Sequence, residues 1–190
     1  MKKYVVFALM LILIAPAAFA QEEEESPEWK ATKKEAKRQK IDETAKEALE
    51  TVIEKGPKAK ELYEQSVGHA VFDNLKIAFG VSGGGGVGVA VKKSDSTRTY
   101  MKMGTAGIGF GLGGQKYQIV FLFQDEKTFT SFVENGWQAD ASAKAAAGTA
   151  GANAKTGFIN GIAIYQMTEA GLMAQADIAG TKYWKYGKLN

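Results

Sequence analysis

The stretch GVSGGGGVGVAV, residues 80–91, decides the fold. Small residues fill its even positions from Gly80 to Ala90, whereas valines stand at the odd positions 81, 87, 89 and 91. Alternation in steps of two is the periodicity of a β-strand, whose successive side chains point to opposite faces. A flexible linker has no reason to place large residues at every second position. We therefore predict a strand with one face nearly bare of side chains.

The same alternation recurs at residues 105–114, where glycines 107, 109, 111 and 113 alternate with Ile108, Phe110 and Leu112. Glycine weakens a strand, so its repeated use indicates that another backbone or a ligand comes very close. One interpretation is a tightly curved antiparallel sheet or barrel whose bare faces let neighbouring layers approach. The other is a groove for an acyl chain or another flat apolar ligand. The candidate residues for such an apolar-ligand face are Gly84, Gly86, Gly88, Gly107, Gly109 and Gly111.

The segment before the glycine-rich region, residues 21–56, is charged and predicted to be helical. Ser26-Pro27 is a suitable start, because serine caps a helix and proline fits its first position, and Gly56-Pro57 is a suitable end. A shorter helix is expected at about 57–65. The apolar stripe expected to pack inward comprises Ile41, Ala45, Ala48, Leu49, Val52 and Ile53.

The rest of the chain fits an antiparallel arrangement, with strands expected near 98–103, 116–124, 158–166 and 171–181. A short helix at about 125–134 would bury Phe129, Phe132 and Val133. Residues 137–154 are rich in alanine, which favours helix, but they alternate at period two, so we favour strand. The predicted fold class is α+β: N-terminal helices, then a glycine-rich, mainly antiparallel curved sheet or barrel-like core with one short helix.

Residues 1–20 are predicted to be a cleaved signal peptide. Lys2 and Lys3 precede an apolar run, and the segment ends in Ala18-Phe19-Ala20. A retained membrane anchor is the weaker alternative, because the apolar run is short for a transmembrane helix. The mature protein would be periplasmic or secreted, with 22 basic and 21 acidic residues and a net charge of +1. This balance predicts no nucleic-acid partner.

Basic residues are concentrated in residues 30–40, where six cations are opposed only by Glu35. A basic helix followed by an apolar stripe can lie on an anionic lipid surface. The alternative is a solvated helix face with helical Lys/Glu pairs. Aromatic residues and lysines also mix at 182–186, which fits either an interfacial anchor or a last strand that covers the sheet. The candidate headgroup-binding residues are Lys33, Lys34, Lys37, Arg38 and Lys40.

The sequence carries no recognisable catalytic, metal or cofactor constellation. Gly80-Val81-Ser82-Gly83-Gly84 has the letters of a nucleophile elbow, but the one histidine, His69, precedes the serine and the following residues favour strand. The chain has no cysteine, so disulfides and thiolate zinc sites are excluded. We expect a non-enzymatic protein without a cofactor, and a hydrolase is a remote alternative.

Five segments together resemble the SYLF domain, also called the Ysc-type actin-binding domain, over residues 57–190. They are HAVFDNLKIAFGVSGGGGVGVAV (69–91), GTAGIGFGLGGQKYQIVFLF (104–123), GWQADASAKAAAGTAGANA (136–154), IAIYQMTEAGLMAQADIAG (162–180) and YGK (186–188). The resemblance implies a lipid-binding domain preceded by an amphipathic helix. It also implies actin binding, which we do not expect here because an exported bacterial protein meets no actin.

The expected function is therefore that of an exported envelope protein that binds anionic phospholipid or a fatty-acyl ligand. The alternative is a structural or protein-interaction module of the envelope that binds a protein partner without a lipid. The domain division expected from the sequence is a signal peptide at 1–20, a charged helical segment at 21–56 and the SYLF-like domain at 57–190.

Overall fold

The computed structural model describes residues 26–56, 58–139, 157–168, 171–173 and 180–190. The predicted signal peptide and most of the 137–154 prediction lie outside the described residues. The helices are α1 (Pro27–Lys55), α2 (Ala59–Gln65) and α3 (Glu126–Asn135). The strands are β1 (Gly68–Lys92), β2 (Arg98–Phe123), β3 (Trp137–Gln138), β4 (Ile162–Thr168), β5 (Gly171–Met173) and β6 (Thr181–Lys185). The predicted α+β class is confirmed, and all described strand pairs are antiparallel.

The long helix α1 begins and ends where the sequence predicts. The Ser26 side chain accepts a hydrogen bond from the backbone N–H of Trp29 at 3.2 Å, and Pro27 occupies the first helical position. The helix stops before Gly56, whose backbone is extended. Its buried residues are Ile41, Ala45, Ala48, Leu49 and Val52, so the predicted apolar stripe faces the protein interior.

One prediction about the sheet is wrong. The expected separate strands at 98–103, 105–114 and 116–124 form the single strand β2, and residues 68–92 likewise form one strand. Gly104 and Gln115, which lie between the predicted segments, do not interrupt β2, because they pair with Gly85 and Lys76 of β1, which keeps the backbone extended. The register shifts once, between Phe79 and Val81. The predicted strand at 158–166 corresponds to β4, and β5 covers the start of the predicted strand at 171–181, of which residues 174–179 lie outside the described part. The strand β6 corresponds to the interpretation of residues 182–186 as a last strand.

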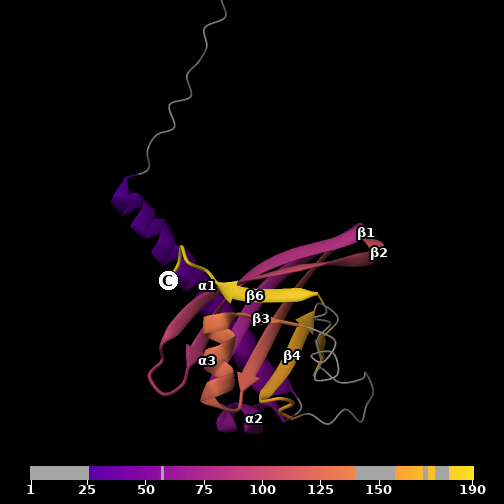
Figure 1. Ribbon diagram of the computed structural model, residues 1–190. Coiled ribbons are helices and arrows are strands. Elements are labelled where there is room, and N and C mark those ends of the chain that lie inside the picture. Colours follow the sequence, from indigo (N-terminus) through magenta and orange to yellow (C-terminus); the bar gives the residue numbers. More distant parts are fainter. Residues whose placement is uncertain (1–25, 57, 140–156, 169–170, 174–179) are drawn as a thin grey trace, which may run out of the picture.

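Helices cover both faces of the sheet, and each face has its own hydrophobic core (Figure 1). On one face, α1 and α2 pack against Val71, Val120 and Leu122. On the other face, α3 packs against alternate residues of the same strands, among them Phe72 and Phe121. Because β2 is buried on both sides near its end, residues 119–123 are all apolar.

The glycine face of β1 lies against the backbone of the same strand. A methyl group added at Gly84 would lie 2.6 Å from the carbonyl oxygen of Leu75, and one added at Gly86 would lie 2.5 Å from that of Asp73. Gly88 faces the Val71 carbonyl in the same way. As the glycine number rises by two, the number of the residue that it faces falls by two. The two halves of β1 therefore run back across each other, with the bend near residues 79–80. The packing interpretation of these glycines therefore has a direct physical basis, since no side chain fits between the two halves of the strand.

We predict that Gly88→Ala lowers the free energy of unfolding by about 1–3 kcal/mol, because a methyl group there overlaps the Val71 carbonyl and the Phe72 ring. Urea unfolding measures the loss. Gly83→Ala in the same strand is the matched control, since its methyl group would meet Thr105 only at 3.9 Å. Equal stability losses in the two variants would contradict the close-approach argument.

His69 lies buried in β1, with its ring 5.8 Å from that of Tyr63. Burial, with smaller contributions from the Lys93 and Arg98 charges, lowers the pKa of His69 from 6.5 to about 4. The folded protein thus binds this proton more weakly than the unfolded chain does, so stability is lost as the pH falls.

We expect this loss between about pH 6.5 and pH 4, reaching about 3 kcal/mol. Urea unfolding of the wild type and of His69→Gln across this range measures it, since carboxylates titrate alike in both proteins. An unchanged pH dependence in His69→Gln would assign the loss to other groups.

Candidate functional site

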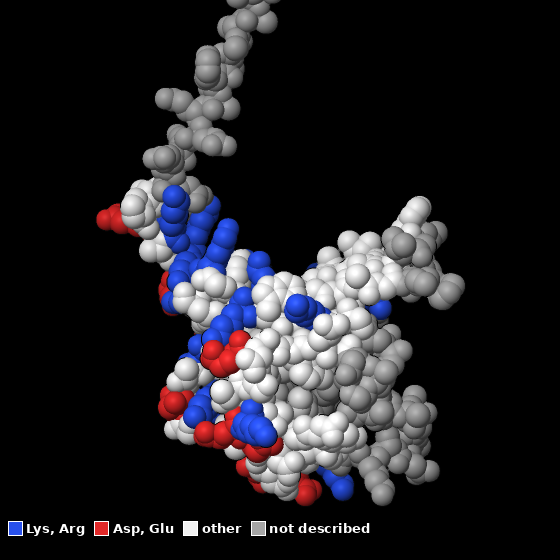
Figure 2. All heavy atoms as spheres, viewed as in Figure 1, with Lys and Arg blue, Asp and Glu red and all other residues white. Residues whose placement is uncertain are grey.

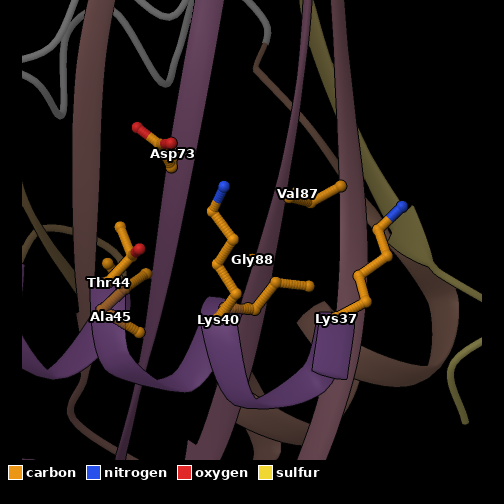
Figure 3. A pocket seen from close by; sticks show the side chains of 9 residues that line it. Lys37, Lys40, Thr44, Ala45, Asp73, Val87 and Gly88 are labelled. Atoms are coloured by element: carbon orange, nitrogen blue, oxygen red, sulfur yellow. The ribbon is translucent and has the colours of Figure 1, made fainter. Parts of the chain in front are cut away.

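A groove runs between α1 and the glycine-rich part of the sheet. Its first part, the inner pocket, has a volume of about 250 Å³. Figure 3 shows lysines of α1 extending beside β1 around this pocket. The residues that line it are Lys37, Lys40, Ile41, Thr44, Ala45, Val71, Asp73, Val87 and Gly88. The pocket thus combines apolar walls with two cations and one carboxylate.

The second part, the outer groove, adjoins the inner pocket and shares Lys37, Asp73 and Val87 with it. It is more open and has a volume of about 580 Å³. Gly84, Gly85 and Gly86 lie along it, so its β1 side carries no side chains there. Its other lining residues are Asn74, Leu75, Lys102, Met103, Gly104, Lys116, Trp184 and Tyr186. Three lysines from α1 and β2 therefore stand around one carboxylate.

Tyr186 holds two of these lysines in place. Its ring centroid lies 4.9 Å from Lys37 Nζ and 4.0 Å from Lys102 Nζ, and Lys37 Nζ donates a hydrogen bond to its hydroxyl oxygen at 3.0 Å. The Lys37 hydrogen bond and the charges of Lys37, Lys102 and Lys188 lower the pKa of the Tyr186 hydroxyl. Cations that stabilise a phenolate also attract a phosphate or carboxylate group, so this end of the groove suits an anion.

The five predicted headgroup residues divide into three sets by their contacts. Lys37 and Lys40 line the groove, whereas Lys34 and Arg38 donate hydrogen bonds to backbone oxygens of Asn190 and Leu189. Lys33 Nζ lies 5.2 Å from the centroid of the Trp29 ring. The prediction that the basic segment forms one headgroup site stays a prediction, and its groove members are Lys37 and Lys40.

The predicted apolar-ligand face is also divided. Gly84 and Gly86 lie along the outer groove, and Gly88 lines the inner pocket. Gly107 lies on β2 and is not among the described lining residues of either part, and the surroundings of Gly109 and Gly111 lie outside what the structure describes. The role of these six glycines in ligand binding therefore stays a prediction.

Sequence reasoning missed the residues that β2 and the C-terminal segment bring to the groove. Lys102 and Lys116 stand in different halves of β2, and the fold of the β1–β2 ribbon brings both to the outer groove. Trp184 and Tyr186 belong to a segment whose mixture of aromatics and lysines is evident from the sequence. The sequence does not indicate which residues this segment contacts. Tyr183 in the same segment is fully buried, so the strand interpretation also holds in part.

Ser82 stands inside β1, opposite Gly107 of β2, and not at the strand-to-helix turn that a nucleophile elbow requires. Among the residues that the structure describes, no group of three or more His, Cys, Asp or Glu side chains is arranged to hold a metal ion. Neither α1 nor any other described helix combines the length and apolar composition needed to cross a bilayer.

The C-terminal segment ties α1 to the sheet. Asn190 accepts a hydrogen bond from the Tyr100 N–H and donates one to the Tyr100 carbonyl oxygen, both at 2.8 Å. Arg38 reaches the Leu189 carbonyl oxygen from α1, and its guanidinium carbon lies 5.4 Å from the centroid of the Tyr100 ring. These contacts fix the α1 side of the groove relative to β2.

We predict that Arg38→Ala lowers the free energy of unfolding by about 1.5–3 kcal/mol, because a charged hydrogen-bond donor to a part-buried carbonyl is removed. The measurement is chemical denaturation. Lys30→Ala, an exposed change of the same charge on the same helix, should shift stability by less than about 0.5 kcal/mol. A loss of the same size in Lys30→Ala would show that helix charge, and not the Leu189 contact, matters.

Residues 104–190 match a family model described as "Ysc84: Las17-binding protein actin regulator". The chain is also 39% identical, over 144 residues, to "Beta cell expansion factor A" of Aeromonas veronii. The matched region covers 76% of this chain and 55% of that relative. The chain thus spans about half the length of the curated relative that it matches. Together these matches agree with the order of segments on which the sequence resemblance rests.

Proposed function

This chain belongs to the SYLF family, and on that premise we propose that it is an exported, non-enzymatic envelope protein whose groove binds an anionic lipid. One observation carries the proposal: a pocket with apolar walls shares lining residues with a groove lined by three lysines. A molecule with an apolar chain at one end and a phosphate or carboxylate at the other matches this order of surfaces.

The headgroup would lie in the outer groove. Lys37, Lys102 and Lys116 approach it from two elements, and lysine ammonium groups bind phosphate as point charges without fixing one orientation. Asp73 is the one carboxylate among the described lining residues, so the cations are in excess. Trp184 adds an aromatic surface of the kind that favours the headgroup region of a membrane.

The inner pocket would take part of an acyl chain. Ile41, Ala45, Val71 and Val87 supply apolar walls, and burying a methylene group among them contributes about 0.8 kcal/mol. Its volume of about 250 Å³ lies below the roughly 300–1,000 Å³ of pockets that enclose a drug-sized ligand. The pocket therefore suits one end of a chain, and the rest of the lipid would remain in the outer groove or in the membrane.

Export gives the proposal its location. The charged start, apolar run and Ala18-Phe19-Ala20 ending of residues 1–20 support cleavage after Ala20 and release to the periplasm or the medium. Because the chain has no cysteine, no acyl group can be attached through a thiol. Attachment to a membrane would then depend on the folded domain itself. The proposed partner is therefore envelope lipid and not actin.

We expect the mature protein to co-sediment with vesicles of 30% phosphatidylglycerol in phosphatidylcholine at low salt, and less so as salt screens the lysines. Lys37→Glu combined with Lys102→Glu should weaken this binding by at least about 30-fold, because two cations each worth about 1 kcal/mol are lost and two anions are added.

Lys60→Glu combined with Lys127→Glu is the matched control, since it changes the net charge equally at exposed positions of α2 and α3. Circular dichroism verifies that both double variants fold. Equal weakening in the two would mean that overall charge, and not the groove, attracts the vesicle. Absence of wild-type binding at low salt would leave the protein-interaction alternative as the better explanation.

A further inference from the structure

The folded β1–β2 ribbon projects beyond the rest of the sheet (Figure 1). We call this part the arm: residues 75–83 of β1 and residues 106–116 of β2, which pair with one another. Leu75, Ile77 and Phe79 share one face of the arm because they are two residues apart. Their exposed fractions rise toward the bend, from 44% to 57% to 78%. Single exposed apolar residues are ordinary, but a ladder of three on a projecting ribbon indicates a contact surface.

The charge pattern of the arm differs from that of an ordinary sheet edge. Residues 77–91 and 103–115 contain no charged side chain, although exposed edge strands are usually protected by charges. The nearest cations stand at the base of the arm, where Leu75 pairs with Lys116 and Lys76 pairs with Gln115. The outer end of the arm is thus apolar, and its base is cationic.

The arm is continuous with the proposed lipid groove. Leu75 and Lys116 belong both to the arm and to the lining of the outer groove. Figure 2 shows the Lys and Arg atoms over the first half of α1 on the same upper side of the molecule as the projecting ribbon. A flat anionic surface on that side would meet the basic helix, the mouth of the groove and the arm together.

We propose that the arm inserts its outer end, with Ile77 and Phe79, into an anionic membrane at the boundary between headgroups and acyl chains. Lys76 and Lys116 then lie at the level of the phosphates, and the mouth of the outer groove faces the bilayer. Insertion stays shallow, because the backbone groups at the edges of a two-stranded ribbon are costly to bury in hydrocarbon. The inference rests on the proposed function, since it supplies the route by which a membrane lipid enters the groove.

The test uses the same phosphatidylglycerol vesicles. Ile77→Ser combined with Phe79→Ser should weaken binding to the vesicles by about 10-fold or more. The binding that persists at high salt should be weakened as well. Ile77→Leu combined with Phe79→Leu keeps the apolar surface and should bind like the wild type. Binding of soluble dihexanoyl-phosphatidylglycerol, which needs the groove but no membrane, should be unchanged in both variants.

A second measurement reports the position of the arm directly. The chain has no cysteine, so Phe79→Cys can be labelled at one site with an environment-sensitive fluorophore. Brominated lipids should quench this label on vesicles and leave a label at Lys60→Cys on α2 unquenched. Quenching at both sites or at neither would overturn shallow insertion of the arm.

The outcomes separate the two proposals. If the serine pair binds vesicles like the wild type while the groove variant Lys37→Glu with Lys102→Glu does not, the arm proposal fails and the groove proposal stands. If the soluble lipid does not bind but the Phe79→Cys label is quenched, the groove proposal fails and the arm proposal stands. A wild-type dimer in sedimentation velocity that the serine pair dissociates, with vesicle binding unchanged, would instead assign the arm to a second copy of the chain.

Discussion

The close approach of the two halves of β1 is the contact on which the architecture depends. Gly84, Gly86 and Gly88 present bare backbone to the carbonyl oxygens of the preceding half of the strand, and any larger residue would separate the two. This contact folds the β1–β2 ribbon across itself. The fold of the ribbon then brings distant parts of β2 to one groove and leaves the bend of the ribbon projecting as the arm.

The two interpretations of the glycines are therefore not exclusive. Gly88 packs against Val71, and both residues also line the inner pocket between β1 and α1. The close packing of the two halves of β1 thus also forms part of the wall of the space proposed for a ligand.

The sequence was informative wherever a pattern is local. The stripe from Ile41 to Val52, the caps of α1 and the buried face of α3 follow from spacing alone, and the structure has all three. The separation of β2 into three strands was wrong because pairing with Gly85 and Lys76 of β1 keeps Gly104 and Gln115 extended, and this long-range contact is not part of the local pattern. Nothing in the spacing of Lys37, Lys102 and Tyr186 predicts their meeting, since only the folded ribbon and the C-terminal segment bring them together.

The basic residues of α1 combine a structural role with the binding role that we propose for them. Arg38 and Lys34 hold the C-terminal segment, which in turn places Tyr186 beneath Lys37 and Lys102. Exposed cation–π contacts contribute only about 0.5–1 kcal/mol. They therefore position these lysines but are weak enough to be replaced by contacts with a ligand. In the proposed function, an anionic headgroup that enters the groove would meet ammonium groups whose side-chain entropy is already partly reduced, which would lower the cost of ordering them around a ligand. Arg38 and Lys34, which contact the C-terminal segment, would thereby position the neighbouring lysines for the proposed binding.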